Sequence, residues 1–182
     1  MNITLIIAIV IVFFIIGAYN KGVSLRNYTK EAFSTMDVYL KKRWDLLPNL
    51  VEIVKSYASH EKDVFTKVVE LRAKNYSQMT NGEKITADKE IKSIVGSLFA
   101  VAENYPELKA NETYTKLMEQ LNALENDIAN SRKYYNGTVR EYNTYLEIFP
   151  TNIIGSMFGM KKENMFEIEE TERENVKVDF SW

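Results

Sequence analysis

Hydrophobic residues follow two different patterns along this chain. From Ile3 to Tyr19 the sequence "ITLIIAIVIVFFIIGAY" is apolar and carries no charge. Beyond it, apolar residues recur at alternating steps of four and three, the spacing of one face of an α-helix. The first pattern predicts a helix surrounded by lipid, and the second predicts helices that pack on one face only.

The apolar run predicts a transmembrane anchor over residues 1–19. A helix of this length reaches roughly 25 Å, near the lower limit for a bilayer core of about 30 Å, and Tyr19 would lie at the interface. Gly17 and Ala18 are small enough for a signal-peptide cleavage site. However, no basic residue precedes the run, whereas signal peptides normally begin with one, so the uncleaved anchor is preferred.

Basic residues follow the apolar run closely. Lys21, Arg26 and Lys30 lie within the roughly 15–20 residues that set membrane orientation. The positive-inside tendency therefore predicts a cytoplasmic C-terminal domain and an N-terminus outside the cell, with export of the domain as the alternative. These cations, and Lys41, Lys42 and Arg43 further along the chain, are also placed to contact anionic lipid headgroups. For Lys41 and Lys42, a solvated helix face is the simpler interpretation.

Residues 20–150 predict an all-α, antiparallel, four-helix-bundle-like domain with long helices. The whole chain has only 7 Gly and 3 Pro, which disfavours a fold of strands and tight turns. One stripe runs from Leu25 to Leu46 and a second runs from Leu50 to Leu71, and "DLLPNL" with Pro48 lies between them. This segment predicts a tight corner, with Pro48 in the first turn of the second helix and Asp45 capping its amides.

Two further helices are predicted after a loop. Asn81-Gly82 predicts the turn and Thr86 a possible N-cap, and a third helix follows up to Ala102. The fourth helix has the clearest stripe, from Tyr114 to Phe149, in which Gly137 indicates either a close helix contact or a kink. Residues 151–182 form an irregular tail, and we expect it to be partly docked through its apolar residues, Ile153, Ile154, Met157, Phe158, Phe166, Val178 and Phe180.

Composition limits the chemistry that the chain can support. The formal net charge is −2, from 23 basic and 25 acidic residues, so no overall basic field predicts nucleic-acid binding. There is no Cys and only one His, His60. A di-iron bundle needs paired Glu-x-x-His motifs, and a Ser-His-Asp triad has no accompanying nucleophile elbow here. We therefore predict no catalytic, cofactor-binding or metal-ligating residue, no cofactor and no small-molecule substrate.

A few polar residues interrupt the apolar stripes. Arg43 and Glu61 both lie on stripe positions, and such groups need partners when they are buried. With a corner at Pro48, Glu61 is expected beside residues 33–37 and Arg43 near Val51, each as a contact that fixes the register of the helices.

The fourth predicted helix carries a cluster of tyrosines. Tyr135, Tyr142 and Tyr145 lie on its stripe and are expected in the core. Tyr134 lies off the stripe, which makes it the better candidate for contact with another protein.

Three segments together resemble the LemA family. These are "YNKGVSLRN" from Tyr19, "MDVYLKKRWDLLPNLVEIVKSYASHE" from Met36 and "SRKYYNGTVREYNTYLEIFP" from Ser131. In the segment from Ser131, Gly137 and Thr138 depart from the acidic or small residues that are more usual at these positions of the family. The resemblance implies a bacterial, single-pass, inner-membrane protein with a mostly antiparallel four-helix domain, and it implies no reaction.

Two functional hypotheses follow from the anchor, the bundle and the apolar tail. The first is a membrane-anchored, non-enzymatic interaction or scaffold protein, with the lipid bilayer and either protein partners or further copies of itself as its contacts. The second is an accessory subunit of a membrane enzyme or of an envelope stress-response system. A stand-alone hydrolase is a third and weaker hypothesis.

Overall fold

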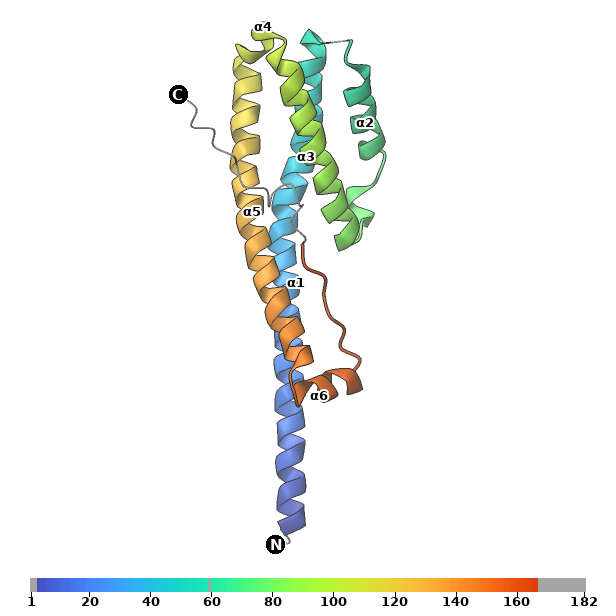
Figure 1. Cartoon of the computed structure of the whole chain (residues 1–182), viewed down its shortest axis with the longest axis vertical. Coiled ribbons are helices and arrows are strands. Elements are labelled where there is room, and N and C mark those ends of the chain that lie inside the picture. The colour runs from blue at the N-terminus through green and yellow to red at the C-terminus, as the bar shows by residue number, and fades with distance from the viewer. Residues whose placement is uncertain (1–2, 59, 167–182) are drawn as a thin grey trace, which may run out of the picture.

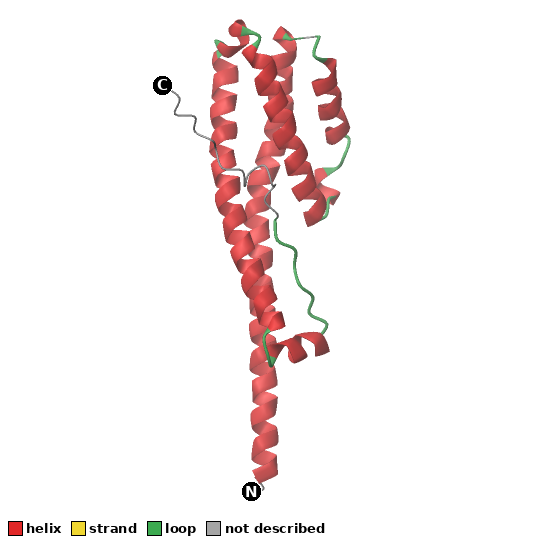
Figure 2. Ribbon diagram, viewed as in Figure 1, coloured by secondary structure: helices red, strands yellow, loops and turns green. Residues whose placement is uncertain are grey.

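Helices and loops form the whole of the chain that this computed structural model describes, residues 3–58 and 60–166 (Figure 1). The all-α fold class is therefore confirmed (Figure 2). In chain order the elements are α1 (Ile3–Tyr57), α2 (Lys62–Arg72), the short 3-10 helix η1 (Tyr76–Gln78), α3 (Asn81–Glu103), α4 (Pro106–Lys109), α5 (Glu112–Glu147) and α6 (Thr151–Met157).

The predicted corner at Pro48 is wrong, because α1 is one helix of 55 residues that passes through this proline. A proline inside a helix costs about 3 kcal/mol, since it lacks an amide donor and crowds the carbonyl four residues earlier, here that of Trp44. Leu47, Leu50 and Val54 are each fully buried on both sides of Pro48. Each such burial stabilises by about 1.5–3 kcal/mol, so the continuous stripe outweighs the proline.

Asp45 also has a different role from the predicted cap. Its carboxylate pairs with Lys41, one turn earlier on the same exposed helix surface. The chain instead reverses after Tyr57, in a short turn that contains the buried Ala58 and leads into α2. Two predicted helices are thus one long helix plus the shorter α2, which ends at Arg72.

The predicted start of the third helix is also wrong by about two turns. Thr80 is the N-cap of α3, and its hydroxyl accepts a bond from the Glu83 amide at 3.3 Å. The Glu83 carboxylate in turn accepts from the Thr80 amide at 2.7 Å, which completes a capping box. Asn81 and Gly82 therefore open the helix and do not form a separate turn.

Helix α5 lies along α1 in the opposite direction. Near one end the Tyr145 hydroxyl donates to the Ala18 carbonyl, and near the other the Asn111 amide donates to the Tyr57 hydroxyl at 3.0 Å. The predicted stripe of α5 is buried at Tyr114, Leu117, Leu121, Leu124, Ile128, Ser131, Tyr135 and Tyr142.

Two details of the α5 prediction are wrong. Phe149 is 78% exposed, because α5 ends at Glu147 before the stripe reaches it. A Cβ built on Gly137 would meet no atom within 4 Å, so this glycine does not mark a close helix contact.

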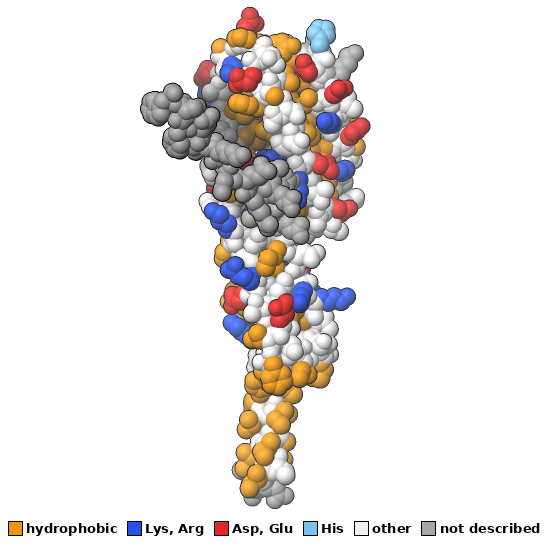
Figure 3. Space-filling model, viewed as in Figure 1, with side chains coloured by type: hydrophobic (Ala, Val, Ile, Leu, Met, Phe, Trp, Pro, Cys, Tyr) orange, Lys and Arg blue, Asp and Glu red, His pale blue; other side chains and the backbone are white. Residues whose placement is uncertain are grey.

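The two parts of α1 have different surroundings. Residues 3–17 extend beyond the bundle with exposed apolar side chains, and they form the narrow, largely orange rod in Figure 3. From Ala18 onwards the helix has a buried face that packs mainly against α5 and α3. Within the described ranges, α1 is the one helix long and apolar enough to cross a membrane.

Candidate functional site

Two asparagines on α5 hold the last described segment of the chain. The Asn143 side chain accepts from the Glu163 amide at 3.0 Å and donates to the Glu163 carbonyl at 2.8 Å. Asn136 does the same for Phe166, accepting from its amide at 2.7 Å and donating to its carbonyl at 2.9 Å. Each amide thereby pairs with both backbone groups of one residue, as a neighbouring β-strand would.

The spacing of these asparagines matches the segment that they hold. Asn136 and Asn143 are two helical turns apart, which is about 10 Å along α5. Glu163 and Phe166 are three residues apart in an extended segment, which is also about 10 Å. Between them, the Tyr135 hydroxyl donates to the Asn164 carbonyl at 2.9 Å. We call Tyr135, Asn136 and Asn143 the asparagine clamp.

Phe166 is the one side chain of this segment that inserts fully into the bundle. It is 2% exposed, and the Arg132 guanidinium lies 4.1 Å from the centre of its ring. A guanidinium over an aromatic face is attracted by the ring's electrons, an interaction that strengthens away from water. The clamp therefore binds the backbone of this segment by hydrogen bonds, and the bundle buries one aromatic side chain.

A buried ionic cluster lies against the same arginine. Arg43 and Asp88 are almost fully buried and lie 3.1 Å apart. Glu125 pairs with Arg43 at 2.9 Å, and Arg132 approaches Asp88 at 3.5 Å. These four residues, from α1, α3 and α5, form what we call the ionic cluster. Burial raises the pKa of Asp88, and the attraction of the two arginines opposes this effect.

Arg43 and Glu61 do not lie where the predicted corner would place them. Arg43 is joined to α3 and α5 and not to the region of Val51, because α1 does not fold back on itself. Glu61 is exposed at the start of α2 and makes no side-chain cap. For Arg43 the structure shows polar contacts across three helices, which suit a role in fixing their register.

Three of the four tyrosines of α5 lie as predicted, and Tyr145 does not reach the core. Tyr135 and Tyr142 are buried, and Tyr134 is 58% exposed. Tyr145 is only partly buried, because it lies at the lower end of the bundle, where its hydroxyl bonds to α1. The asparagines of the clamp were not predicted as site residues. Two amides seven positions apart beside an apolar stripe do not by themselves identify the distant backbone that they bind.

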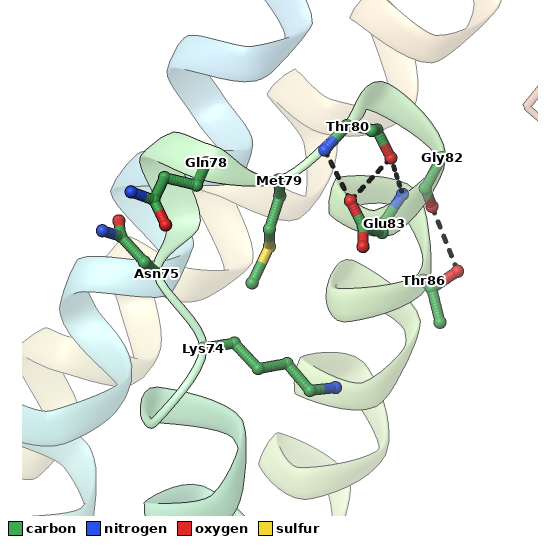
Figure 4. Close-up of a pocket in the computed structure, with 8 residues that line it drawn as sticks. All are labelled: Lys74, Asn75, Gln78, Met79, Thr80, Gly82, Glu83 and Thr86. Atoms are coloured by element: carbon green, nitrogen blue, oxygen red, sulfur yellow. Dashed lines mark hydrogen bonds between the residues drawn. The ribbon is translucent and has the colours of Figure 1, made fainter.

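Two further features lie outside the clamp and the ionic cluster, near α2 and the start of α3. A hollow of about 580 Å³ lies beside the start of α3, lined by Lys74, Asn75, Gln78, Met79, Thr80, Gly82, Glu83 and Thr86 (Figure 4). Its Thr80 and Glu83 groups bond to each other, and Lys74 pairs with Glu90 at 3.2 Å. His60 is exposed in the turn before α2. Residues 3–58 and 60–166 contain no group of three or more acidic or His side chains that could hold a metal ion.

The apolar tail residues are only partly described. Ile154 and Phe166 are buried, whereas Ile153, Met157 and Phe158 are exposed. Val178 and Phe180 lie outside the described residues. Residues 158–166 return along the bundle from α6 toward the clamp (Figure 1).

Comparison with known proteins gives a consistent family. The LemA family matches residues 32–180. Protein LemA of Metamycoplasma hominis is 24% identical over 173 residues, which cover 94% of this chain and 79% of that protein. Magnetosome protein MamQ 2 of Paramagnetospirillum magneticum is 24% identical over 175 residues, covering 82% of this chain. The match spans 64% of the length of that magnetosome protein.

Proposed function

Since this chain belongs to the LemA family, we propose that it is a membrane-anchored interaction and scaffold protein without enzymatic activity of its own. The asparagine clamp is the observation that carries this proposal. It is a binding site for an extended peptide, built on a rigid helix that packs along the anchor-bearing α1.

The clamp supports assembly because it binds mainly backbone. Asn136 and Asn143 make four bonds to main-chain groups, and the buried Phe166 supplies the side-chain contact. A site of this kind accepts an extended segment from whichever chain supplies it. Exchange of the tail between copies would link neighbouring molecules at a fixed height above the membrane.

Anchoring by α1 supports a role at the membrane. The exposed apolar residues 3–17 continue without a break into the packed part of the helix, so the bundle is held close to the bilayer. Lys21, Arg26 and Lys30 favour a cytoplasmic bundle. In that orientation, protease added to intact spheroplasts leaves the bundle whole until the membrane is permeabilised. Its loss from intact spheroplasts would place it outside.

Assembly of the full chain in mild detergent tests the scaffold. We expect homogeneous complexes of several copies from the wild type and a change in their size for Asn136→Ala/Asn143→Ala. Asn126→Ala is the matched control, because this asparagine is exposed on the same helix and bonds only to the Asn122 carbonyl of its own turn. Single copies from wild type and variants alike would contradict the proposal.

An accessory subunit is the second candidate, and the exposed Tyr134 favours it. An exposed tyrosine on a rigid helix is a suitable contact for another protein. The name of the relative MamQ 2 also assigns that protein to the magnetosome. Stoichiometric co-purification of one other protein with single copies of this chain, lost in Tyr134→Ala, would support this function over the scaffold.

A further inference from the structure

The base of the bundle carries an uncharged apolar surface where the rod leaves it. Residues 148–160, "IFPTNIIGSMFGM", contain no charged residue and include α6. Their exposed hydrophobic side chains are Ile148, Phe149, Ile153, Met157 and Phe158. In Figure 3 an orange band lies at this junction, and in Figure 1 α6 lies across the direction of α1. We call residues 148–160 the collar.

The collar is fixed to both long helices. The Tyr19 and Phe158 rings lie 4.6 Å apart, and the Tyr145 hydroxyl bonds to the Ala18 carbonyl just beside them. Ile154 and Gly155 form the buried face of α6.

Two glycines make this attachment close. A Cβ on Gly155 would come within 2.7 Å of Leu146 Cδ2, and a Cβ on Gly22 within 2.9 Å of Met160 Sδ. Contacts this tight hold α6 in one orientation. Ile153 and Met157 are therefore held away from the bundle.

The height of the collar matches a deficit in the anchor. The bare part of α1, from Ile3 to Gly17, is about 22 Å long, whereas a bilayer core is about 30 Å thick. The collar contacts α1 at Tyr19, through Phe158, and at Gly22, through Met160. If the collar is immersed, the uncharged height runs from Ile3 to Asn20, just before Lys21, and becomes about 27 Å.

Charge marks the same boundary. Lys21 lies in the first turn of the packed part of α1, and Lys161 and Lys162 directly follow the collar. Lys162 pairs with Glu147 at 2.6 Å, so an ion pair between one residue before the uncharged segment and one residue shortly after it joins its two ends. Apolar side chains with basic residues beside them are typical of segments that lie in the lipid interface.

We propose that the collar is an interfacial membrane-binding element, whose Phe149, Ile153, Met157 and Phe158 side chains enter the lipid around the base of α1. This inference rests on the proposed anchoring of α1 and adds a second point of attachment. One helix alone leaves the bundle free to tilt and rotate. A collar beside it sets the height and the tilt of the clamp above the bilayer.

Nitroxide labels at single cysteines test the collar in the full chain, which has no Cys of its own. The protein is placed in vesicles of phosphatidylglycerol and phosphatidylcholine, with labels at Ile153→Cys or Met157→Cys, both exposed positions. Collision rates are measured with oxygen, which enriches in lipid, and with a water-soluble nickel complex. Phe13→Cys reports the rod, and the exposed Ser34→Cys reports the bundle surface.

We expect both collar labels to resemble Phe13, with a higher ratio of oxygen to nickel collisions than Ser34. If the collision ratio at Phe13 is that of a site in lipid and the ratios at Ile153 and Met157 are those of sites in water, the collar proposal fails and the anchor stands. Water values at Phe13 would overturn the anchor and the collar together. Collar labels that become shielded from both reagents only as the protein-to-lipid ratio rises would show that a second copy covers this surface, which also overturns the proposal.

Discussion

Residues 3–17 and residues 18–57 share one helix, α1, but their side chains meet different surroundings. In the first part, large apolar residues such as Phe13 are exposed around the helix. In the second part, buried residues such as Met36 and Leu47 recur on one face, and exposed polar residues occupy the other. The backbone is helical in both parts and does not distinguish them. The side-chain pattern does, because the bare part is apolar on all sides and the packed part is apolar on one face.

The comparison also shows what decides where a helix ends. Pro48 lies in the packed part, where the stripe on both sides of it belongs to one buried core. The helix ends only after Tyr57, where the chain turns into α2. Burial of the stripe, and not the local preference of one residue, sets the length of α1.

A charge placed in each part gives the largest expected contrast. Leu47→Asp puts an unpaired carboxylate into the core and should lower the free energy of unfolding by more than about 4 kcal/mol. Phe13→Asp should leave the bundle's stability in detergent within about 0.5 kcal/mol and weaken membrane insertion by about 2.5–3.5 kcal/mol. Denaturation followed by circular dichroism and carbonate extraction measure the two effects. Similar unfolding losses in both variants would contradict the division of α1.

Replacing the proline tests the continuity of the packed part. Pro48→Ala restores an amide that can bond to the Trp44 carbonyl, so it should stabilise the bundle by up to about 3 kcal/mol. Pro106→Ala is the matched control, because Pro106 lies in the first turn of α4, where proline is favourable. Thermal unfolding of the full chain measures both. A loss of stability in Pro48→Ala would indicate a corner.

Two tyrosines on α5, the partner of the packed part, give a smaller contrast. Tyr135→Phe removes the bond to the Asn164 carbonyl and should cost about 1 kcal/mol, with faster hydrogen exchange at the amides of Glu163 and Phe166. The Tyr142 hydroxyl is buried without a hydrogen-bond partner among the described residues, so Tyr142→Phe should cost nothing or stabilise slightly. Equal losses of stability in the two variants, with unchanged hydrogen exchange at Glu163 and Phe166, would contradict the role of Tyr135 in the clamp.

The ionic cluster gives the smallest expected effect, a change of stability with pH. Asp88 sets the direction of this change. The pKa of this carboxyl is raised above 3.8 by burial, with Arg43, Arg132 and Glu125 as its charged neighbours. Its stabilising contribution is complete below about pH 4 and is lost as the pH rises through the folded-state value. Asp88→Asn stays neutral throughout, so its stability relative to wild type should increase from pH 3 to pH 7. A relative decrease over this range would contradict the raised pKa.

Periodicity was sufficient to predict the helical class, the exposed rod and the buried stripe of α5. The corner at Pro48 was wrong because a local proline preference was weighed without the tertiary burial of Leu47 and Leu50. The start of α3 could have been found from the Thr80-x-x-Glu83 pattern. The clamp could not, because Asn136 and Asn143 bind backbone that is far away in the sequence.

One distance tests the central claim that α1 runs through Pro48 as a single helix. Nitroxide labels are placed at Ser34→Cys and Ser56→Cys, two exposed positions on either side of Pro48. A continuous α1 places these positions about 33 Å apart, at 1.5 Å per residue. Pulsed electron–electron double resonance on the full chain should therefore show a narrow distribution of distances between the labels, centred near that value. A main distance below about 20 Å, as expected for two antiparallel helices joined at Pro48, would contradict the account.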